Sequence, residues 1–158
     1  MLVRADLSLV SDLAALAEDR DWLVSERALD LLEKLAHEHP ECLAPYRHVF
    51  IGRLADSDKW EIHLQIVRAL PLLDWTPSER RRVVEILRRD VDHPQKFVQA
   101  WALDSLATIA QQEADLMPVV RRYLRQFAGS GSKALATRAR HIRERLSSKP
   151  RQAGRLRG

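Results

Sequence analysis

Two side chains on one predicted helix, Trp101 and Asp104, have the types and the spacing to carry chemistry. Residues three apart on a helix lie on the same face. An indole there can stack on a nucleobase, and a carboxylate one turn away can stabilise a cationic transition state. The alternative is structural: Asp104 pairs with a basic residue of a neighbouring helix. One such spacing is a weak catalytic signal, so both interpretations stay open.

A second group of reactive side chains comprises His37, His39, Glu41 and Cys42. The two histidines lie on opposite sides of a helix, so we interpret them as positive groups at a helix C-terminus rather than as metal ligands. Cys42, the only cysteine, has no histidine–acid arrangement to activate it and is interpreted as a packing residue. Since no glycine-rich phosphate loop occurs either, we expect no enzymatic activity, no metal and no cofactor.

The composition limits the fold. The chain has 158 residues, of which 46% are hydrophobic and 30% charged, as in a globular domain. Of five glycines, only Gly52 precedes residue 129, whereas hairpins and dinucleotide-binding loops need several residues with positive φ. Abundant Leu, Ala, Arg and Glu predict an all-α fold. The single cysteine fits a reducing cytoplasm, and the lack of an apolar run of about 18 residues predicts no membrane insertion.

Apolar residues at helical spacing predict eight helices. Their apolar stripes span residues 9–17, 23–35, 43–54, 62–73, 83–91, 97–110, 116–127 and 135–146. Thr76-Pro77-Ser78-Glu79 reads as a capping box at the start of the fifth helix. Acidic turns at Asp19–Asp21 and Asp56–Asp58 are predicted to cap the helices that follow them.

An internal repeat relates alternate helices. The segments 24–35 and 98–109 share one pattern of apolar positions. A central, mostly small position recurs at Ala28, Ile66, Ala102 and Ala139, in steps of 38, 36 and 37 residues. A period of this length indicates stacked helix pairs rather than a compact bundle.

These repeats resemble the HEAT repeat family. The resemblance rests on outer helices with an internal proline, Pro45 and Pro118, and on the acidic turn Asp56–Asp58. Inner helices of the valine-x-x-x-alanine type follow, although the arginine usual after the valine is Ser25, His63, Gln99 or Ala136 here. The resemblance implies a right-handed α-α superhelix, a solenoid of about four HEAT-like helix pairs. We expect residues 1–147 to form this domain and residues 148–158 to form a basic, disordered tail.

In such a solenoid the inner helices line the concave side, and equivalent positions form three rows that we call the three-row face. The first row contains Arg27, Gln65, Trp101 and Arg138; the second Asp30, Arg68, Asp104 and His141; the third Lys34, Leu72, Thr108 and Arg145. Offsets of three and seven keep the rows on one side of each helix. The second row alternates in sign, so one interpretation is that its charges pair with one another and set the stacking angle.

The leading hypothesis for function is a non-enzymatic scaffold that binds a protein partner along the three-row face. Arg27, Arg68, Trp101 and Arg138 are the strongest candidates, because Trp and Arg dominate interface energetics. Some HEAT-like alkylpurine DNA glycosylases are similar in having concave tryptophans and an aspartate. This likeness makes a glycosylase activity through Trp101 and Asp104 the weakest alternative.

Nucleic-acid binding is the rival hypothesis, because charge is unevenly distributed. Residues 121–158 hold 12 Lys and Arg but one acid, a formal charge of +11, whereas the first 120 residues hold 14 basic and 21 acidic residues, a charge of −7. A basic end indicates an anionic partner, although a solvated arginine face is an equally simple interpretation. The candidates for anion binding are Arg81, Arg82, Arg88, Arg89, Arg121, Arg122, Arg125 and Arg151.

Overall fold

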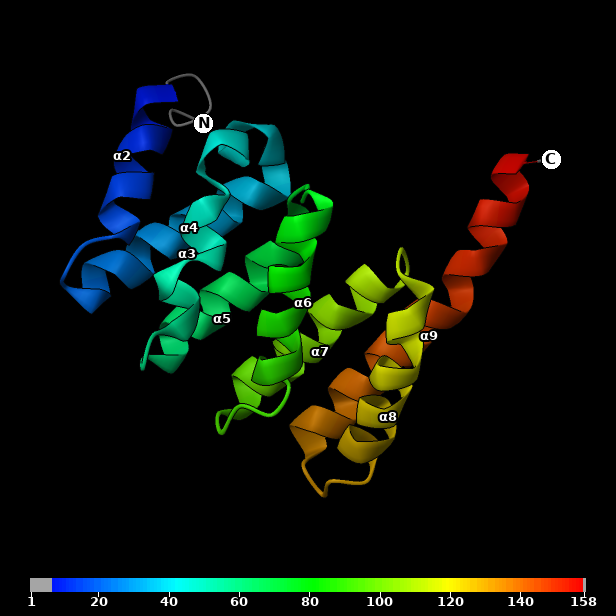
Figure 1. Ribbon diagram of the computed structural model, residues 1–158. Coiled ribbons are helices and arrows are strands. Elements are labelled where there is room, and N and C mark those ends of the chain that lie inside the picture. Colours follow the sequence, from blue (N-terminus) through cyan, green and yellow to red (C-terminus); the bar gives the residue numbers. More distant parts are fainter. Residues whose placement is uncertain (1–6, 158) are drawn as a thin grey trace.

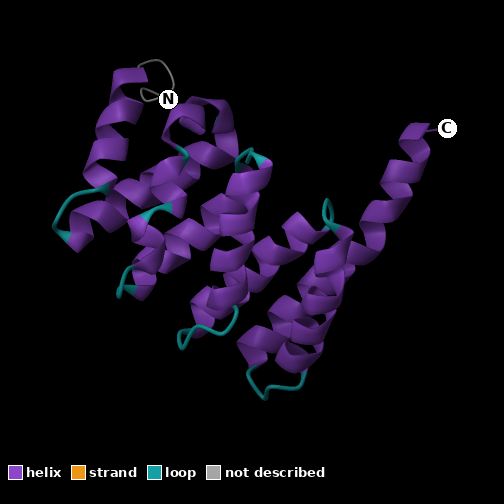
Figure 2. Ribbon diagram, viewed as in Figure 1, coloured by secondary structure: helices purple, strands orange, loops and turns teal. Residues whose placement is uncertain are grey.

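The computed structural model describes residues 7–157, and the side chains of residues 7–148. This part of the chain is helical with short loops and contains no strand (Figure 2). The α-helices are α2 (Leu7–Ala17), α3 (Trp22–Glu38), α4 (His48–Ile51), α5 (Trp60–Ala69), α6 (Pro77–Asp90), α7 (Lys96–Ala110), α8 (Met117–Ala128) and α9 (Lys133–Arg157). Short 3-10 segments are η1 (Pro40–Tyr46), η2 (Arg53–Asp56), η3 (Leu70–Leu72) and η4 (Ala114–Leu116). The predicted all-α class is confirmed.

The helices pack in order along the chain. α3, α5, α7 and α9 contact one another in succession, and α2, α4, α6 and α8 pack beside them (Figure 1). Three helices of the first set pack on the α-helix that precedes them: α3 on α2, α7 on α6 and α9 on α8, whereas α5 packs on the 3-10 segment η2. Within the described residues, no helix combines the length and apolarity that crossing a membrane requires.

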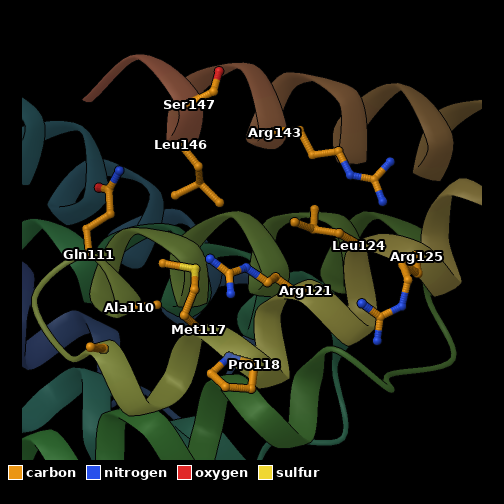
Figure 3. Close-up of a pocket in the computed structure, with 11 residues that line it drawn as sticks. Ala110, Gln111, Met117, Pro118, Arg121, Leu124, Arg125, Arg143, Leu146 and Ser147 are labelled. Carbon is orange, nitrogen blue, oxygen red and sulfur yellow. The ribbon is translucent and has the colours of Figure 1, made fainter. Parts of the chain in front are cut away.

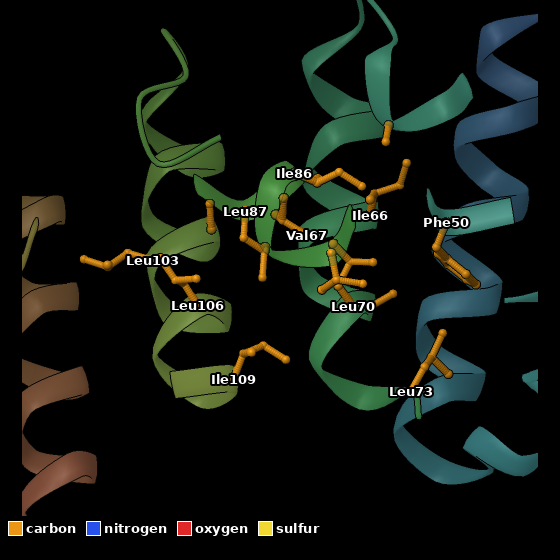
Figure 4. Packing of buried hydrophobic residues seen from close by; sticks show 14 of the residues in the cluster. Phe50, Ile66, Val67, Leu70, Leu73, Ile86, Leu87, Leu103, Leu106 and Ile109 are labelled. Atoms are coloured by element: carbon orange, nitrogen blue, oxygen red, sulfur yellow. The ribbon is translucent and has the colours of Figure 1, made fainter. Parts of the chain in front are cut away.

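The core runs between these helices. Its largest fully buried side chains come from several elements and meet across them, as shown for α5, α6 and α7 (Figure 4). They include Phe50, Ile66, Leu70, Ile86, Leu103 and Leu106. Because burial of apolar area is the main stabilising contribution, the stacking of helices on one another holds each of them in place.

The predicted third helix is broken. The stripe at residues 43–54 forms η1, α4 and η2 instead of one helix. Pro45 lies inside η1 and cannot donate a backbone hydrogen bond, and Gly52 separates α4 from η2. The fourth helix likewise ends at Ala69, and Pro71 lies in the short segment η3 that follows. Leu72, placed on a helix by the row pattern, therefore lies in a 3-10 turn.

The predicted caps are confirmed at two helices and wrong at a third. Thr76 and Glu79 form the capping box of α6, with Glu79 N 3.3 Å from Thr76 Oγ1 and Thr76 N 2.9 Å from Glu79 Oε1. Asp21 caps α3 by accepting from Leu23 N. Asp58 does not cap α5; the N-cap residue is Lys59, whose amide donates to Ser57 Oγ instead.

The last helix extends beyond the predicted stripe. The backbone of α9 is helical as far as Arg157, although Pro150 and Gly154 predict a poor helix there. Its C-terminal part projects beyond α8 (Figure 1). The side chains of residues 149–158 lie outside the described part of the chain, so a separate basic tail stays a prediction.

Candidate functional site

The three-row face lies on the exposed sides of α3, α5 and α7. The buried residues of α3 and α7 occupy the opposite sides of these helices. On α7 the row positions 101, 104 and 108 are each partly exposed, while the residues between them are buried. The predicted rows therefore share an accessible surface, except at Gln65, which is buried.

Trp101 lies at the centre of this face between two guanidinium groups. The guanidinium carbon of Arg138 on α9 lies 4.4 Å from the centre of the indole ring, and that of Arg68 on α5 lies 5.0 Å away. A cation over an aromatic face is stabilised by about 0.5–1 kcal/mol at an accessible site. The stack therefore links α5, α7 and α9. The two guanidinium groups also leave the indole ring of Trp101 less free to stack on a base.

Asp104 holds two arginines of α9. Its carboxylate accepts from Arg138 Nη1 at 3.1 Å and from Arg145 Nη1 at 2.8 Å. Arg145 also donates to the Asp104 carbonyl and to Thr108 Oγ1. These contacts favour the structural interpretation of Asp104, because both carboxylate oxygens already accept from cations.

The second row does not pair with itself. Among the described residues no ion pair joins two of its members; Asp30 bonds Lys34 on its own helix at 2.8 Å. Arg68 instead reaches Glu33, which is 1% exposed, at 3.4 Å. The predicted ladder is corrected in this respect: Arg68 pairs with Glu33 outside the rows, and Asp104 pairs with Arg138 and Arg145 of the other two rows.

Two acidic residues on α3, Glu26 and Glu33, form contacts that the sequence did not predict. Glu33 contacts both Arg68 and His37, and Glu26 accepts from Gln65 Nε2 at 3.0 Å. Both acids lie outside the rows, and Glu33 falls within the buried side of α3. Their roles depend on the offset between α3 and α5, so no spacing within α3 could have identified them.

Two exposed row members form no ion pair within the described part of the chain. Arg27 and His141 are exposed, and no ion pair of either is found among the described residues. His141 and Arg138 line a small depression of about 440 Å³ beside Lys133 and Thr137. Arg27 and His141 can therefore contact a partner without breaking an ion pair within the described residues.

Two of the predicted anion-binding arginines hold α6 against α4 and η2. Arg82 donates to Asp56 at 3.1 Å and to the Ile51 carbonyl at 3.1 Å. Arg89 donates to Asp56 at 2.6 Å and to Asp90 at 3.0 Å, and these arginines hold the pKa of Asp56 below its usual value. Their donors are therefore occupied inside the chain.

The other predicted anion-binding arginines are more accessible. Arg81 and Arg88 on α6 are exposed, as are three arginines on α8. Arg122 lies 5.2 Å from the ring centre of its neighbour Tyr123, whereas Arg121 and Arg125 border a groove between α8 and α9. The side chain of Arg151 lies outside the described residues.

A buried charge pair joins α5 to α6. The two ring nitrogens of His63 face acceptors only: Nδ1 donates to Asp90 at 2.8 Å and Nε2 to the Ser57 carbonyl at 2.6 Å. Burial lowers the pKa of His63, but the hydrogen bonds and the charge of Asp90 outweigh it and raise the pKa above 6.5. Both acceptors favour the protonated ring, in which His63 ties the loop before α5 to the end of α6.

The histidines and cysteine near residue 40 do not converge. His37 contacts Glu33, and His39 Nδ1 lies 3.2 Å from Glu41 Oε1, while Cys42 is partly buried against the core. In the part of the chain with described side chains, no group of three or more His, Cys, Asp or Glu residues could hold a metal ion.

Exposed apolar side chains on the face were also missed. Leu23 is 48% exposed, Leu31 50% and Phe97 61%. Leu23 and Leu31 lie one turn before and after Arg27, and Phe97 lies one turn before Trp101. The apolar pattern of the sequence places all three in the buried stripes, since apolarity alone does not show which side of a helix is covered.

Comparison with known proteins gives no match: no family model, no curated protein and no solved structure is similar to this chain.

Proposed function

We propose that this chain is a HEAT-like repeat scaffold, not an enzyme, and that it binds a protein partner along the three-row face. Support for the repeat architecture comes from the pairwise order of the helices. Contacts among α3, α5, α7 and α9 are more extensive than those between α4 and α6. This difference supports a superhelix in which the more closely packed helices line the concave side.

The observation that carries the proposal is the apolar content of an otherwise charged face. Leu23, Leu31 and Phe97 are each about half exposed or more, and the indole of Trp101 is partly accessible among them. Exposed apolar groups rimmed by polar ones are typical of protein interfaces.

The charges of the face favour a protein over a nucleic acid. Arg68 pairs with Glu33, and Arg138 and Arg145 pair with Asp104. A phosphate would have to displace these carboxylates, whereas a peptide can add hydrogen bonds to the pairs and bury the leucines beside them. We infer that the partner contributes apolar side chains and mixed charges, as a helix or an extended segment.

A binding experiment with matched variants tests this function. The partner is first isolated as a stable stoichiometric complex with the full chain, and its affinity is then measured with purified proteins. We expect Trp101→Ala to weaken binding by about 2 kcal/mol, which is roughly 30-fold. Far-ultraviolet circular dichroism of the variant should match the parent chain.

Two exposed arginines provide a second test variant and its matched control. Arg27→Ala on α3 should weaken the complex, whereas Arg88→Ala on α6 should not, because Arg88 lies on the other layer of helices. Full affinity in both Trp101→Ala and Arg27→Ala would refute the assignment of the face. Tight oligonucleotide binding that falls steeply with salt, together with no protein complex, would favour the nucleic-acid alternative.

A further inference from the structure

A groove lies between α8 and α9, apart from the three-row face. Its volume is about 960 Å³. The floor is apolar and is formed by Ala110 at the end of α7, Met117 and Leu124 on α8, and Leu146 on α9. Figure 3 shows Leu146 above Met117 and Leu124, with open space between the two helices.

The position of the groove explains why its floor is uncovered. Each of α5 and α7 packs between two neighbours of the same layer, whereas α9 packs mainly against α7 and α8. In the described residues no further helix pair stacks on α8 and α9. Two antiparallel helices with an apolar seam are a surface on which a third helix packs well.

The rim of the groove is strongly basic. Arg121 and Arg125 on α8 and Arg143 on α9 border it, and all three are exposed. None of them forms an ion pair within the described part of the chain, in contrast to Arg82 and Arg89. α8 contains no acidic residue, and Glu144 is the only acid after residue 120. An occupant that covers the apolar floor and carries negative charge would therefore pair favourably with this rim.

We propose that the groove between α8 and α9 binds an amphipathic helix of a partner protein whose apolar stripe is flanked by acidic residues. Apolar side chains at positions i, i+3, i+4 and i+7 would lie on Met117, Leu124 and Leu146, as in other helix-in-groove complexes. Glutamates beside that stripe would pair with Arg121, Arg125 and Arg143. The floor spans two turns of α8, so a partner helix of about three turns would cover it.

This site is independent of the proposed function, since none of its residues belongs to the three-row face. Trp101 and Arg138 lie outside the groove, and the groove residues can be changed without touching the Arg68–Trp101–Arg138 stack. A failure here would leave the binding of a partner by the three-row face intact, and the reverse also holds.

The test uses a synthetic peptide with the full-length chain. The probe is a fluorescein-labelled helical peptide of about 14 residues with leucines at i, i+3, i+4 and i+7 and glutamates on both sides. One control peptide carries lysines in place of the glutamates, and another carries serines in place of the leucines. Fluorescence anisotropy measures the affinity of each peptide at low and high salt.

Charge reversal of the rim provides the matched variants. The double variant Arg121→Glu with Arg143→Glu should weaken the acidic peptide about tenfold and strengthen the lysine peptide. Arg88→Glu, an exposed arginine on α6, is the control and should leave both affinities unchanged. The serine peptide should bind neither chain, because the apolar floor would gain no contact.

Several results would overturn the proposal. Equal affinity of the parent chain for the glutamate and lysine peptides, or no binding at about 0.2 mM peptide, excludes an acidic helix as the occupant. Concentration-dependent dimerisation that the double variant abolishes would assign the groove to a second copy of the chain. Duplex DNA binding that needs the same arginines, without peptide binding, would assign it to phosphate.

Discussion

Replacing Asp90 by asparagine tests whether the buried imidazolium of His63 holds α5 to α6. The Asp90 side chain is 1% exposed and that of His63 is 8% exposed. Asp90 accepts from His63 Nδ1 at 2.8 Å through one oxygen and from Arg89 Nε at 3.0 Å through the other. The variant removes one negative charge from between two cations and keeps the shape of the side chain.

The expected loss follows from the cost of leaving buried charge without its partner. Breaking a buried ion pair destabilises a protein by about 3–5 kcal/mol. The amide oxygen of asparagine can still accept one hydrogen bond, so we expect a loss near the lower end, about 3 kcal/mol. For a chain of this size that loss lowers the melting temperature by roughly 6–12 °C.

The pH dependence gives the sharper signature. Because the folded pKa of His63 lies above its unfolded value of 6.5, its contribution is complete below about pH 6.5 and is lost as pH rises through the folded pKa. His93, whose ring centre lies 5.1 Å from that of His63, acts in the opposite sense: burial, then the charge of His63, lowers its pKa. The parent chain therefore needs comparison with the variant at each pH.

Urea unfolding followed by circular dichroism, at about pH 6 and about pH 9 and constant ionic strength, measures the difference. We expect Asp90→Asn to cost more at pH 6, where His63 is charged, than at pH 9. Asp58→Asn, at an exposed acid in the loop that precedes α5, is the matched control and should change stability little at either pH. An equal loss at both pH values would refute the imidazolium assignment.

Three further predictions concern the fold. Thr76→Ala removes the cap of α6 and should cost about 1 kcal/mol in urea unfolding, with Ser78→Ala as a milder control. Leu106→Ala in the fully buried core should cost about 2–5 kcal/mol, and a loss below 1 kcal/mol would show that the stacked core collapses around the cavity. Deleting residues 148–158 should leave the melting temperature nearly unchanged and flatten the salt dependence of partner binding; a large fall in melting temperature would instead show that this part of α9 is structurally required.

Local sequence was enough to predict most of the helices. Apolar spacing and the caps at Asp21 and Thr76 depend on residues within about four positions, so they can be recognised without knowledge of the fold. The same reasoning failed over residues 43–54, where the apolar stripe persists although Pro45 and Gly52 break the helix. The spacing of apolar residues predicts which residues are buried, but it does not distinguish one α-helix from several short helical segments that bury the same residues.

The exposed sides of α3 and α7 could be predicted from the spacing of similar apolar segments, because positions that recur every 36–38 residues are expected to meet similar surroundings. The ion-pair partners of the charged side chains could not be predicted in this way. Arg68 pairs with Glu33, and Arg89 with Asp56, across 33 to 35 residues of chain, and each choice depends on the axial offset of two packed helices.

The helical class, the recurrence of similar apolar segments every 36–38 residues and the concentration of basic residues in the C-terminal part can all be recognised in the sequence. The pairing of Arg82 and Arg89 within the chain, and the position of Arg121, Arg125 and Arg143 at the border of an apolar groove, become visible only once the helices are packed together. The physical reason is range: helix propensity and capping act over one turn, whereas ion pairing and burial depend on side chains that the packing of distant helices brings within a few ångströms.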